Sequence, residues 1–385
     1  MPRRVFITAA EFSGDQHASQ LIHSLRQLDP DLLIEGHGGQ EMAAAGALIH
    51  QETTRGAAMI LKAVARAGEM WRLFRWTKRY FAQNRPDLLI CVDSPAMNFH
   101  FAKIAHERGI PVLYYIAPQL WAWREGRMRK LRNWVDHVAC ILPFEEDYFR
   151  RHGVNATFVG HPLFDQLPPQ RGPAPGPRFP DRPPVIGLLP GSRRSEALAN
   201  YPHLLHVASH VRSAFPDVSF LVPTTPATHP LVQKMSHAID RLEFGLGLFD
   251  RMVPQCDLCV TVSGTATLHV AGYGIPMVAV YRFSRTLWNL VGRWLLKTRT
   301  YTLVNLLAEQ REHIVPEYIP WFGSTRPVAD HVIDFLRHPH KLALQQARLA
   351  QMIARLDKPG ASMKAAALAM SMISTPPAPK TTAPA

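Results

Sequence analysis

An aspartate that directly follows an apolar run is the strongest candidate for a general base in this sequence. Asp93 ends the run DLLICVD and is followed by a proline turn and by Asn98. A carboxylate at the end of a buried strand is partly desolvated, so its pKa rises toward the working pH of an enzyme. An Asx-type turn is the structural alternative. We expect Asp93 to be a catalytic base, with Asn98 beside it.

A second pair of carboxylates lies in the segment AAEFSGD. Glu11 and Asp15 flank Ser13 and Gly14, and the two small residues open a helical pattern. In a parallel sheet, the ends of the strands and the starts of the following helices meet at one edge, where ligands bind. These carboxylates are therefore expected at the same edge as Asp93. Helix capping is the structural alternative for this segment.

Two turns have the composition of an anion site. LLPGSRRSE places Ser192 and Arg193 between a strand and a helix, and TVSGTATLH places Ser263, Gly264 and Thr265 in the same way. The first N–H groups of a helix lie at the positive end of its dipole, and an arginine adds a forked donor. Together the turns predict a pyrophosphate site that matches neither a Walker A nor a GxGxxG pattern. Capping by Ser263 or Thr265 is the alternative.

The composition indicates a folded protein with an acidic partner. The chain has 385 residues, 47% of them hydrophobic, and a net charge of +13. Phosphorylated substrates, anionic lipid and nucleic acid are the candidates. No nucleic-acid-binding motif is found and the basic residues are spread over both halves, which disfavours nucleic acid. The four cysteines are expected to be buried thiols, and no signal peptide or membrane-spanning run is found, so a cytosolic or peripherally bound protein is expected.

Two segments are amphipathic, basic and rich in tryptophan. They span residues 59–81 and 285–299, and the first includes Trp71 and Phe74 in its apolar stripe. Helices of this kind can lie in the interface of an anionic membrane. Packing of the apolar stripe on the core is the alternative.

Alternating β-branched runs and helical patterns predict an α/β fold with parallel sheets. We expect a Rossmann-like domain at 1–167, a Pro/Gly-rich linker at 168–183, a second Rossmann-like domain at 184–327, helices at 328–373 and a disordered tail at 374–385. The predicted strands lie in RVFITAA, LLIEGHGG, DLLICVD, PVLYYIA, VIGLLPGSR, VSFLVPT, LCVTVSG and PMVAVYR, and the predicted helices include 16–28 and 99–107.

The order of these segments resembles the lipid-A-disaccharide synthase family, glycosyltransferases of family 19 with the GT-B fold. The resemblance runs from about Val5 to Asp334, and its most specific parts are AAEFSGD, GHGGQEMAAAG, VDSPAMNF, APQLWAWREGRMRKL, ILPFEEDYFRRHGV, FVGHP, LPGSRRSE, SGTATL and GIPMVAVYR. It implies two facing Rossmann-like domains joined by a hinge. The implied reaction transfers 2,3-diacylglucosamine from its UDP derivative to the 6-hydroxyl of 2,3-diacylglucosamine 1-phosphate, with inversion and without a metal or cofactor. N–H donors and positive charge would then stabilise the diphosphate leaving group.

The resemblance also implies roles for individual residues. Asp93 would be the base toward the acceptor hydroxyl, Arg193 would hold the diphosphate, and Glu11 or Asp15 could share the base role on the acceptor side. The residues expected to bind substrate are Ser13, Gly14, Asp15, Asn98, Gln119, Ser192, Ser263, Gly264, Thr265, His269, Tyr281, Arg282 and Asn305. The enzyme would act at the inner face of the cytoplasmic membrane, and since some members of the family dimerise, a homodimer is among the expected states.

One departure from the family keeps other hypotheses open. His269 stands where the family usually has a glutamate, which binds the ribose hydroxyls in related GT-B enzymes. An imidazole can make one hydrogen bond there, but it cannot accept a pair of them from a diol. A related UDP-sugar transferase with a different lipid acceptor and a non-catalytic paralogue that binds lipid or nucleotide are therefore the alternatives.

Overall fold

The chain divides into two compact units in the computed structural model. The N-terminal unit comprises Met1–Gln166 and Lys358–Ala385, and the C-terminal unit comprises Leu167–Asp357. The structure describes residues 2–54, 63–121, 125–167, 179–236, 239–283, 300–308, 313–356 and 358–375. Most of the predicted linker, the whole amphipathic segment 285–299 and nearly all of the predicted tail lie outside these residues.

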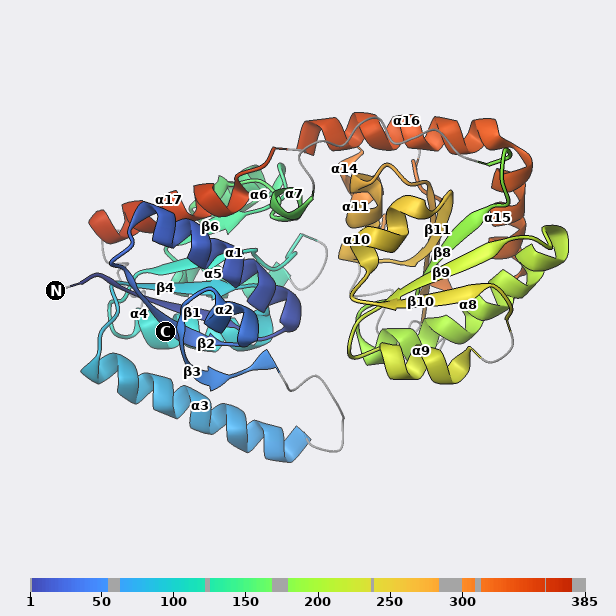
Figure 1. Cartoon of the computed structure of the whole chain (residues 1–385). Coiled ribbons are helices and arrows are strands. Elements are labelled where there is room, and N and C mark those ends of the chain that lie inside the picture. The colour runs from blue at the N-terminus through green and yellow to red at the C-terminus, as the bar shows by residue number, and fades with distance from the viewer. Residues whose placement is uncertain are drawn as a thin grey trace. The chain divides into compact units, whose positions relative to one another are not determined.

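The N-terminal unit is built on a seven-stranded sheet with the order β3-β2-β1-β4-β5-β6-β7 (Figure 1). Its strands, which pair in parallel, are β1 (Arg4–Ala9), β2 (Leu33–Gly38), β3 (Leu48–Glu52), β4 (Leu88–Val92), β5 (Val112–Tyr115), β6 (His137–Cys140) and β7 (Ala156–Phe158). The chain leaves β1 toward β2 on one side and later adds β4 on the other side. The strand order therefore reverses between β1 and β4, and an open α/β sheet binds its ligands at such a reversal, beyond the carboxyl ends of the strands.

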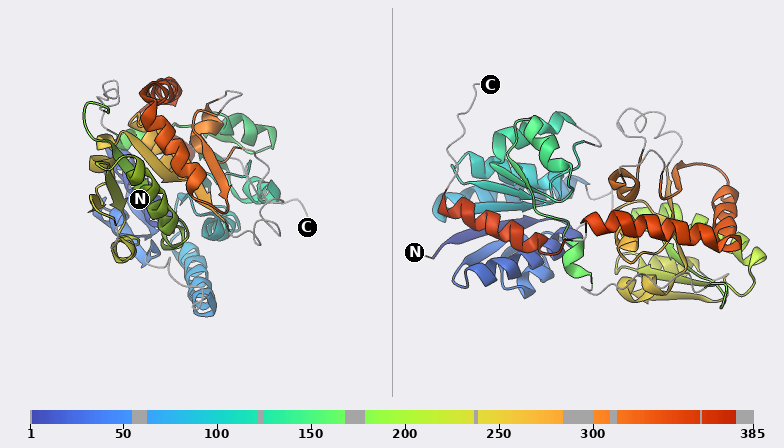
Figure 2. Two further views of the ribbon diagram at one scale, coloured as in Figure 1. Left: turned by 90° about the vertical axis from the view of Figure 1, so that its right-hand side faces the viewer. Right: turned by 90° about the horizontal axis from the view of Figure 1, so that it is seen from above.

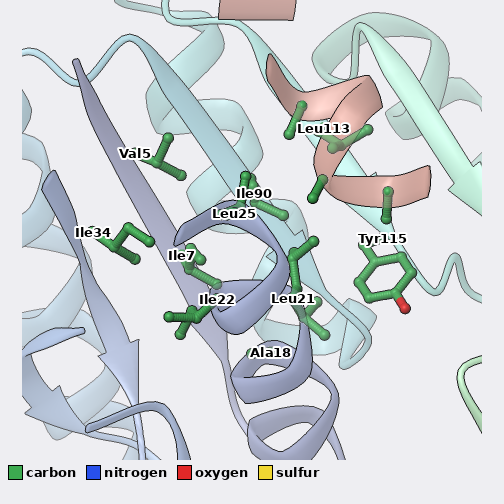
Figure 3. Close-up of a cluster of buried hydrophobic side chains, with 14 of the residues drawn as sticks. Val5, Ile7, Ala18, Leu21, Ile22, Leu25, Ile34, Ile90, Leu113 and Tyr115 are labelled. Carbon is green, nitrogen blue, oxygen red and sulfur yellow. The ribbon is translucent and has the colours of Figure 1, made fainter. Parts of the chain in front are cut away.

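Helices cover both faces of this sheet. They are α1 (Phe12–Leu28), α2 (Gln40–Ala44), α3 (Ala63–Gln83), α4 (Pro95–His106), α5 (Met128–Trp134), α6 (Glu145–Arg151), α7 (Leu163–Gln166) and α17 (Ala361–Ser374). On one face, Leu21 and Leu25 of α1 pack against Val5 and Ile7 of β1 (Figure 3). On the other face, Phe6 of β1 packs with α3 and α4, because successive side chains of a strand point to opposite faces.

Two of these helices begin earlier than the sequence predicts. α1 begins at Phe12 rather than near residue 16, and α4 begins at Pro95 rather than near residue 99. Proline suits the first turn of a helix, because its missing N–H would have no partner there. Both helices consequently start directly at the ends of β1 and β4, and their first turns border the strand reversal.

The last helix belongs to the N-terminal unit, although the two helices before it do not. α17 lies along α1 and buries Ala365 and Ala369 in the core of this unit (Figure 2). Its first turn is held by Asp165, whose carboxylate accepts the N–H groups of Gly360, Ala361 and Ser362 at 2.6, 3.1 and 2.8 Å. A carboxylate at this end of a helix satisfies otherwise unpaired N–H groups and faces the positive end of the dipole.

The C-terminal unit contains a six-stranded parallel sheet with the order β10-β9-β8-β11-β12-β13. Its strands are β8 (Val185–Leu189), β9 (Ser219–Thr224), β10 (Leu242–Leu246), β11 (Leu258–Val262), β12 (Met277–Arg282) and β13 (Glu317–Trp321). Its helices are α8 (Arg194–Ala214), α9 (His229–Met235), α10 (Phe249–Met252), α11 (Thr265–Gly272), α14 (Leu303–Leu307), α15 (Arg326–Arg337) and α16 (Pro339–Leu356). Here the strand order reverses between β8 and β11. The predicted C-terminal helices are thus α15 and α16 in this unit and α17 in the other.

Not all the side chains of the apolar stripe predicted for residues 59–81 pack on the core in the helix α3. Phe74 packs on the core, whereas Trp71 is 60% exposed and the guanidinium of Arg75 lies over its ring at 5.1 Å. Within the described part of the chain, no helix combines the length and the apolar character that a membrane crossing requires. All four cysteines are buried thiols, as predicted.

Replacement of Asp165 by alanine should destabilise the docking of α17. Three backbone N–H groups lose their acceptor, so the free energy of unfolding should fall by about 2 kcal/mol. Urea unfolding followed by circular dichroism measures the change, with exposed Asp31→Ala as the control. Equal midpoints for Asp165→Ala and the native protein would show that the cap contributes nothing.

Candidate active site

The end of β4 adopts a backbone conformation that is unusual for its residues. Asp93 and Ser94 both have left-handed φ angles, of 52° and 42°. Ile116, at the end of the neighbouring strand β5, has a φ of 59°, which is uncommon for a β-branched residue. Such strained residues gather at functional sites, where the surrounding structure maintains them. The edge of the sheet around Asp93 is therefore the first candidate for an active site.

Hydrogen bonds from buried side chains hold the backbone at Asp93. Its carbonyl oxygen accepts the amide of Asn98 and the hydroxyl of Tyr114, both at 2.7 Å, and its N–H donates to Tyr115. Asn98 is completely buried, and its amide oxygen accepts the hydroxyl of Thr8 at 2.8 Å. Asn98, which the sequence predicts as a substrate-binding residue, thus has its side chain engaged in positioning Asp93.

The start of α1 lies against this loop. A Cβ added to Gly14 would lie 3.6 Å from the carbonyl oxygen of Val92 and 4.0 Å from the Cβ of Asp93. Glu11 is the N-cap residue of α1 and is partly exposed, and Ser13 is exposed at the same edge. The structure therefore brings Glu11, Ser13 and Gly14 to the strand reversal together with Asp93, as the sequence predicts.

Asp15, which the sequence also predicts as a substrate-binding residue, is instead buried in the protein. Its carboxylate is 1% exposed and accepts the N–H groups of Gly39, Glu41 and Met42 at 2.7, 3.0 and 3.4 Å. It therefore holds the loop that leads from β2 into α2.

A buried glutamate holds the loop after β5, which carries Gln119 as an exposed residue. Glu145 accepts the indole N–H of Trp121 at 3.0 Å and the backbone N–H groups of Ile141 and Leu142 at 3.2 and 3.1 Å. Burial raises the pKa of its carboxyl from 4.5 to about 7, and the three donors only partly oppose the rise. Glu145 lies in the motif ILPFEEDYF, but the sequence does not mark it as a structural residue, because its burial depends on the tertiary structure.

In the C-terminal unit, the turn after β8 lies at the reversal of strand order between β8 and β11. Gly191 has a φ of 99°, and a Cβ there would lie 2.7 Å from a carboxylate oxygen of Glu196, so the turn requires glycine. Arg193 is the N-cap of α8, and its guanidinium lies 3.1 Å from the other oxygen of Glu196. Ser192 is exposed, and its carbonyl oxygen accepts the hydroxyl of Thr225 at 3.1 Å.

The turn after β11 lies at the same reversal of strand order. Gly264 has φ 158° and ψ −161°, a combination almost restricted to glycine, and Thr265 is the exposed first residue of α11. Ser263 donates its hydroxyl to the carbonyl of Tyr301 at 3.0 Å. The N-termini of α8 and α11 thus both lie at the reversal between β8 and β11, and the N–H groups of their first turns can bind an anion with Arg193.

His269 lies one turn into α11, but its imidazole is engaged within the unit. Its Nε2 is 2.8 Å from a carboxylate oxygen of Asp250, which also accepts the hydroxyl of Tyr273 at 3.0 Å. The contact with His269 is the main cause that holds the pKa of Asp250 below its ordinary value. The ring of Phe249 packs on the imidazole at 4.4 Å.

The remaining predicted residues lie on or beside β12 and α14. Burial raises the pKa of Tyr281; Glu196 adds to the rise and Arg193 opposes it, so Tyr281 lies close to the start of α8. Arg282 donates to the carbonyl of Gly323 at 3.2 Å, with its guanidinium 5.6 Å from the ring of Trp321. Asn305 is 6% exposed, and its amide bonds with the backbone of Val315 and with Glu317.

Chemically, the strand reversals of the two units carry different groups. The N-terminal unit presents carboxylates on a strained, braced edge, which suits proton abstraction. The C-terminal unit presents two helix N-termini and an arginine, which suits a diphosphate. No group of three or more histidine, cysteine, aspartate or glutamate side chains in the described ranges is arranged to hold a metal ion.

Comparison with solved structures identifies the class of fold. The UDP-GlcNAc 2-epimerase from Neisseria meningitidis, determined with UDP-GlcNAc bound, matches with a TM-score of 0.58 and 11% identity over 92% of this chain and 98% of that one. Acinetobacter baumannii MurG matches with a TM-score of 0.56 and 14% identity over 96% and 100%. The protein has the two Rossmann-like domains of the GT-B class.

Sequence comparison gives the family within this class. The model of the lipid-A-disaccharide synthetase family matches residues 5–370. The lipid-A-disaccharide synthase of Geobacter metallireducens is 34% identical over 96% of this chain and 97% of the relative, and that of Anaeromyxobacter sp. (strain K) is 36% identical over 94% and 96%. The chain belongs to the lipid-A-disaccharide synthetase family and is a hexosyltransferase, which confirms the resemblance and the fold predicted from the sequence.

Replacement of Glu145 by glutamine should change how stability depends on pH. Because burial raises the pKa of Glu145 from 4.5 to about 7, the fold favours the protonated acid, and this stabilisation is lost as the pH rises through that interval. Relative to Glu145→Gln, the native free energy of unfolding should fall by about 3 kcal/mol between pH 4.5 and pH 8.

Urea unfolding at several pH values measures this difference. Titrating groups that both proteins share contribute equally and cancel in this comparison. One of them is His37, because burial lowers its pKa to about 3. Exposed Glu107→Gln is the control. If the free energy of unfolding changes with pH in the same way for the native protein and Glu145→Gln, the pKa of Glu145 is not raised.

Proposed function

We propose that this glycosyltransferase condenses UDP-2,3-diacylglucosamine with 2,3-diacylglucosamine 1-phosphate, giving the β-1,6-linked lipid A disaccharide 1-phosphate and UDP. Family membership over residues 5–370 supports the reaction, since the family and its relatives are named for lipid A disaccharide synthesis. The structural observation that carries the proposal is that each unit has a strand reversal, with carboxylates at one reversal and an arginine beside two helix N-termini at the other.

Asp93 is the proposed base. It takes the proton of the acceptor 6-hydroxyl as that oxygen attacks the anomeric carbon, and the bond from that carbon to the UDP oxygen breaks. One inversion follows, because the nucleophile enters opposite the leaving group. Glu11 lies at the same edge and is proposed to orient the acceptor, together with Ser13 and Gln119. Support comes from the braced left-handed backbone, which fixes where the Asp93 carboxylate can point.

The leaving UDP is proposed to bind in the C-terminal unit. Arg193, Ser192, Gly264 and Thr265 neutralise the diphosphate with charge and N–H donors as negative charge develops on the leaving oxygen. Tyr281 is proposed to cover the donor from the neighbouring strand. His269 is proposed to contact the nucleotide while its Nε2 stays paired with Asp250.

The acylated substrates require access to a membrane, and we propose that α3, α4 and α5 provide it. Trp71, Arg72, Arg75, Lys78 and Arg79 of α3 are all exposed. α4 packs between α3 and α5 and adds Lys103, while α5 adds Lys130; both ammonium groups lie 5.8 Å from the ring of Trp134. This basic face suits anionic headgroups at the inner face of the cytoplasmic membrane.

Asp93→Asn should abolish turnover without unfolding the protein. Asparagine tolerates the left-handed conformation but cannot take a proton, so kcat should fall by about a hundredfold to ten thousandfold. The assay is acceptor-dependent UDP release from UDP-2,3-diacylglucosamine in detergent micelles, with exposed Asp217→Asn as the control. Activity near the native level in Asp93→Asn would show that Asp93 is not the base, and Glu11 would be the next residue to replace.

Trp71→Ser should weaken binding to vesicles that contain anionic lipid. Burying an indole in the interface contributes about 1–2 kcal/mol, so the partition coefficient should fall by about tenfold. Vesicle sedimentation measures it. Leu48→Ser is the matched control, because Leu48 is 62% exposed on the same unit but lies on β3, opposite Glu35 of β2 rather than among basic residues. Equal losses in the two variants would contradict the proposed face.

A further inference from the structure

A glutamate outside the predicted site holds the chain segment that contacts the turn after β11. Glu317 is the first residue of β13, and its carboxylate accepts four hydrogen bonds from one segment of chain. The donors are the backbone N–H groups of Tyr301 and Thr302 at 3.0 Å each, the hydroxyl of Thr302 at 2.6 Å and the amide of Asn305 at 2.7 Å. Hydrogen bonds to an ionised acceptor are about twice as strong as neutral ones, so Glu317 fixes this segment firmly.

One of these donors belongs to the same peptide group that contacts Ser263. The N–H of Thr302 and the carbonyl of Tyr301 are the two ends of a single planar peptide and point in opposite directions. The N–H donates to Glu317 and the carbonyl accepts the hydroxyl of Ser263 at 3.0 Å. A charge-assisted bond at one end of a peptide polarises it and strengthens the bond at the other end. Glu317 therefore sets the direction of the Ser263 hydroxyl through one peptide.

This direction decides what Ser263 can recognise. A serine hydroxyl has one proton to donate and two lone pairs that accept. Since the proton is used on Tyr301, Ser263 has only lone pairs to offer a ligand. Lone pairs suit a hydroxyl or N–H group and repel a phosphate oxygen.

We propose that Glu317 is a positioning residue that makes Ser263 an acceptor for a hydroxyl or N–H group of the UDP-sugar, while the diphosphate is bound by other donors. This inference rests on the proposed function, because it takes the UDP-sugar as the ligand. Thr302 provides a way to separate this role from a purely structural one. Its hydroxyl donates to Glu317 and accepts the N–H of Asn305, but it is not part of the peptide between Glu317 and Ser263.

The test compares Glu317→Gln, Ser263→Ala, their double variant and Thr302→Val by calorimetric binding of UDP, UDP-2,3-diacylglucosamine in micelles and inorganic pyrophosphate. Glu317→Gln and Ser263→Ala should each weaken binding of the UDP-sugar by about fivefold to tenfold. The double variant should bind the UDP-sugar no more weakly than the more affected of the two single variants. Pyrophosphate affinity should be unchanged. Thr302→Val should lower the Tm but keep the affinity, and exposed Glu243→Gln is the matched control.

Three results would overturn the proposal. The first is native UDP-sugar affinity in Glu317→Gln. The second is a loss in Thr302→Val as large as in Glu317→Gln, which would make the effect one of stability alone. The third is an equal loss for pyrophosphate in Ser263→Ala, which would make Ser263 a phosphate donor. Acceptor-dependent turnover by the native protein is measured alongside: if it is present, any of these results refutes only this inference, and if it is absent, the proposed function fails first.

Discussion

The reversal of strand order in each parallel sheet is the constraint on which the site depends. Where the chain leaves two adjacent strands toward opposite sides, no crossover covers the space beyond their carboxyl ends, and the following helices direct their N-termini toward it. In one unit this place lies between β1 and β4 and carries Glu11 and Asp93; in the other it lies between β8 and β11 and carries Arg193 and Gly264. The two reversals therefore carry different groups: carboxylates in the N-terminal unit, and an arginine beside helix N-termini in the C-terminal unit.

Much of the polar chemistry near these edges holds the loops in shape. Asn98 braces the backbone of Asp93, Asp15 caps α2, and Asn305 is engaged with Val315 and Glu317. Each has its hydrogen-bonding capacity used within the protein, as buried polar groups must. Their contribution to a reaction would be to preorganise the groups that face the substrate. That role is consistent with the strained backbone at Asp93, which needs such support.

The sequence predicted the central strands and both strand-end turns, because buried parallel strands are continuous apolar runs and the turns need glycine or serine. It missed β6 and the four edge strands of the two sheets, β3, β7, β10 and β13, most of whose residues are at least partly exposed and so do not form continuous apolar runs. It also could not separate ligand-facing from scaffold residues. Asp15 and Glu11 are four residues apart in one motif, yet one is buried against α2 and the other faces the edge, and only the tertiary contacts distinguish them. Glu145 and Glu317 were missed for the same reason.

Calorimetric binding of UDP to full-length variants tests whether the two units divide these roles. If the C-terminal unit binds the nucleotide diphosphate and the N-terminal unit supplies the base, Asp93→Asn should bind UDP with native affinity, whereas Arg193→Ala should lose about tenfold or more. Loss of UDP affinity in Asp93→Asn, with native affinity in Arg193→Ala, would instead assign nucleotide binding to the N-terminal unit.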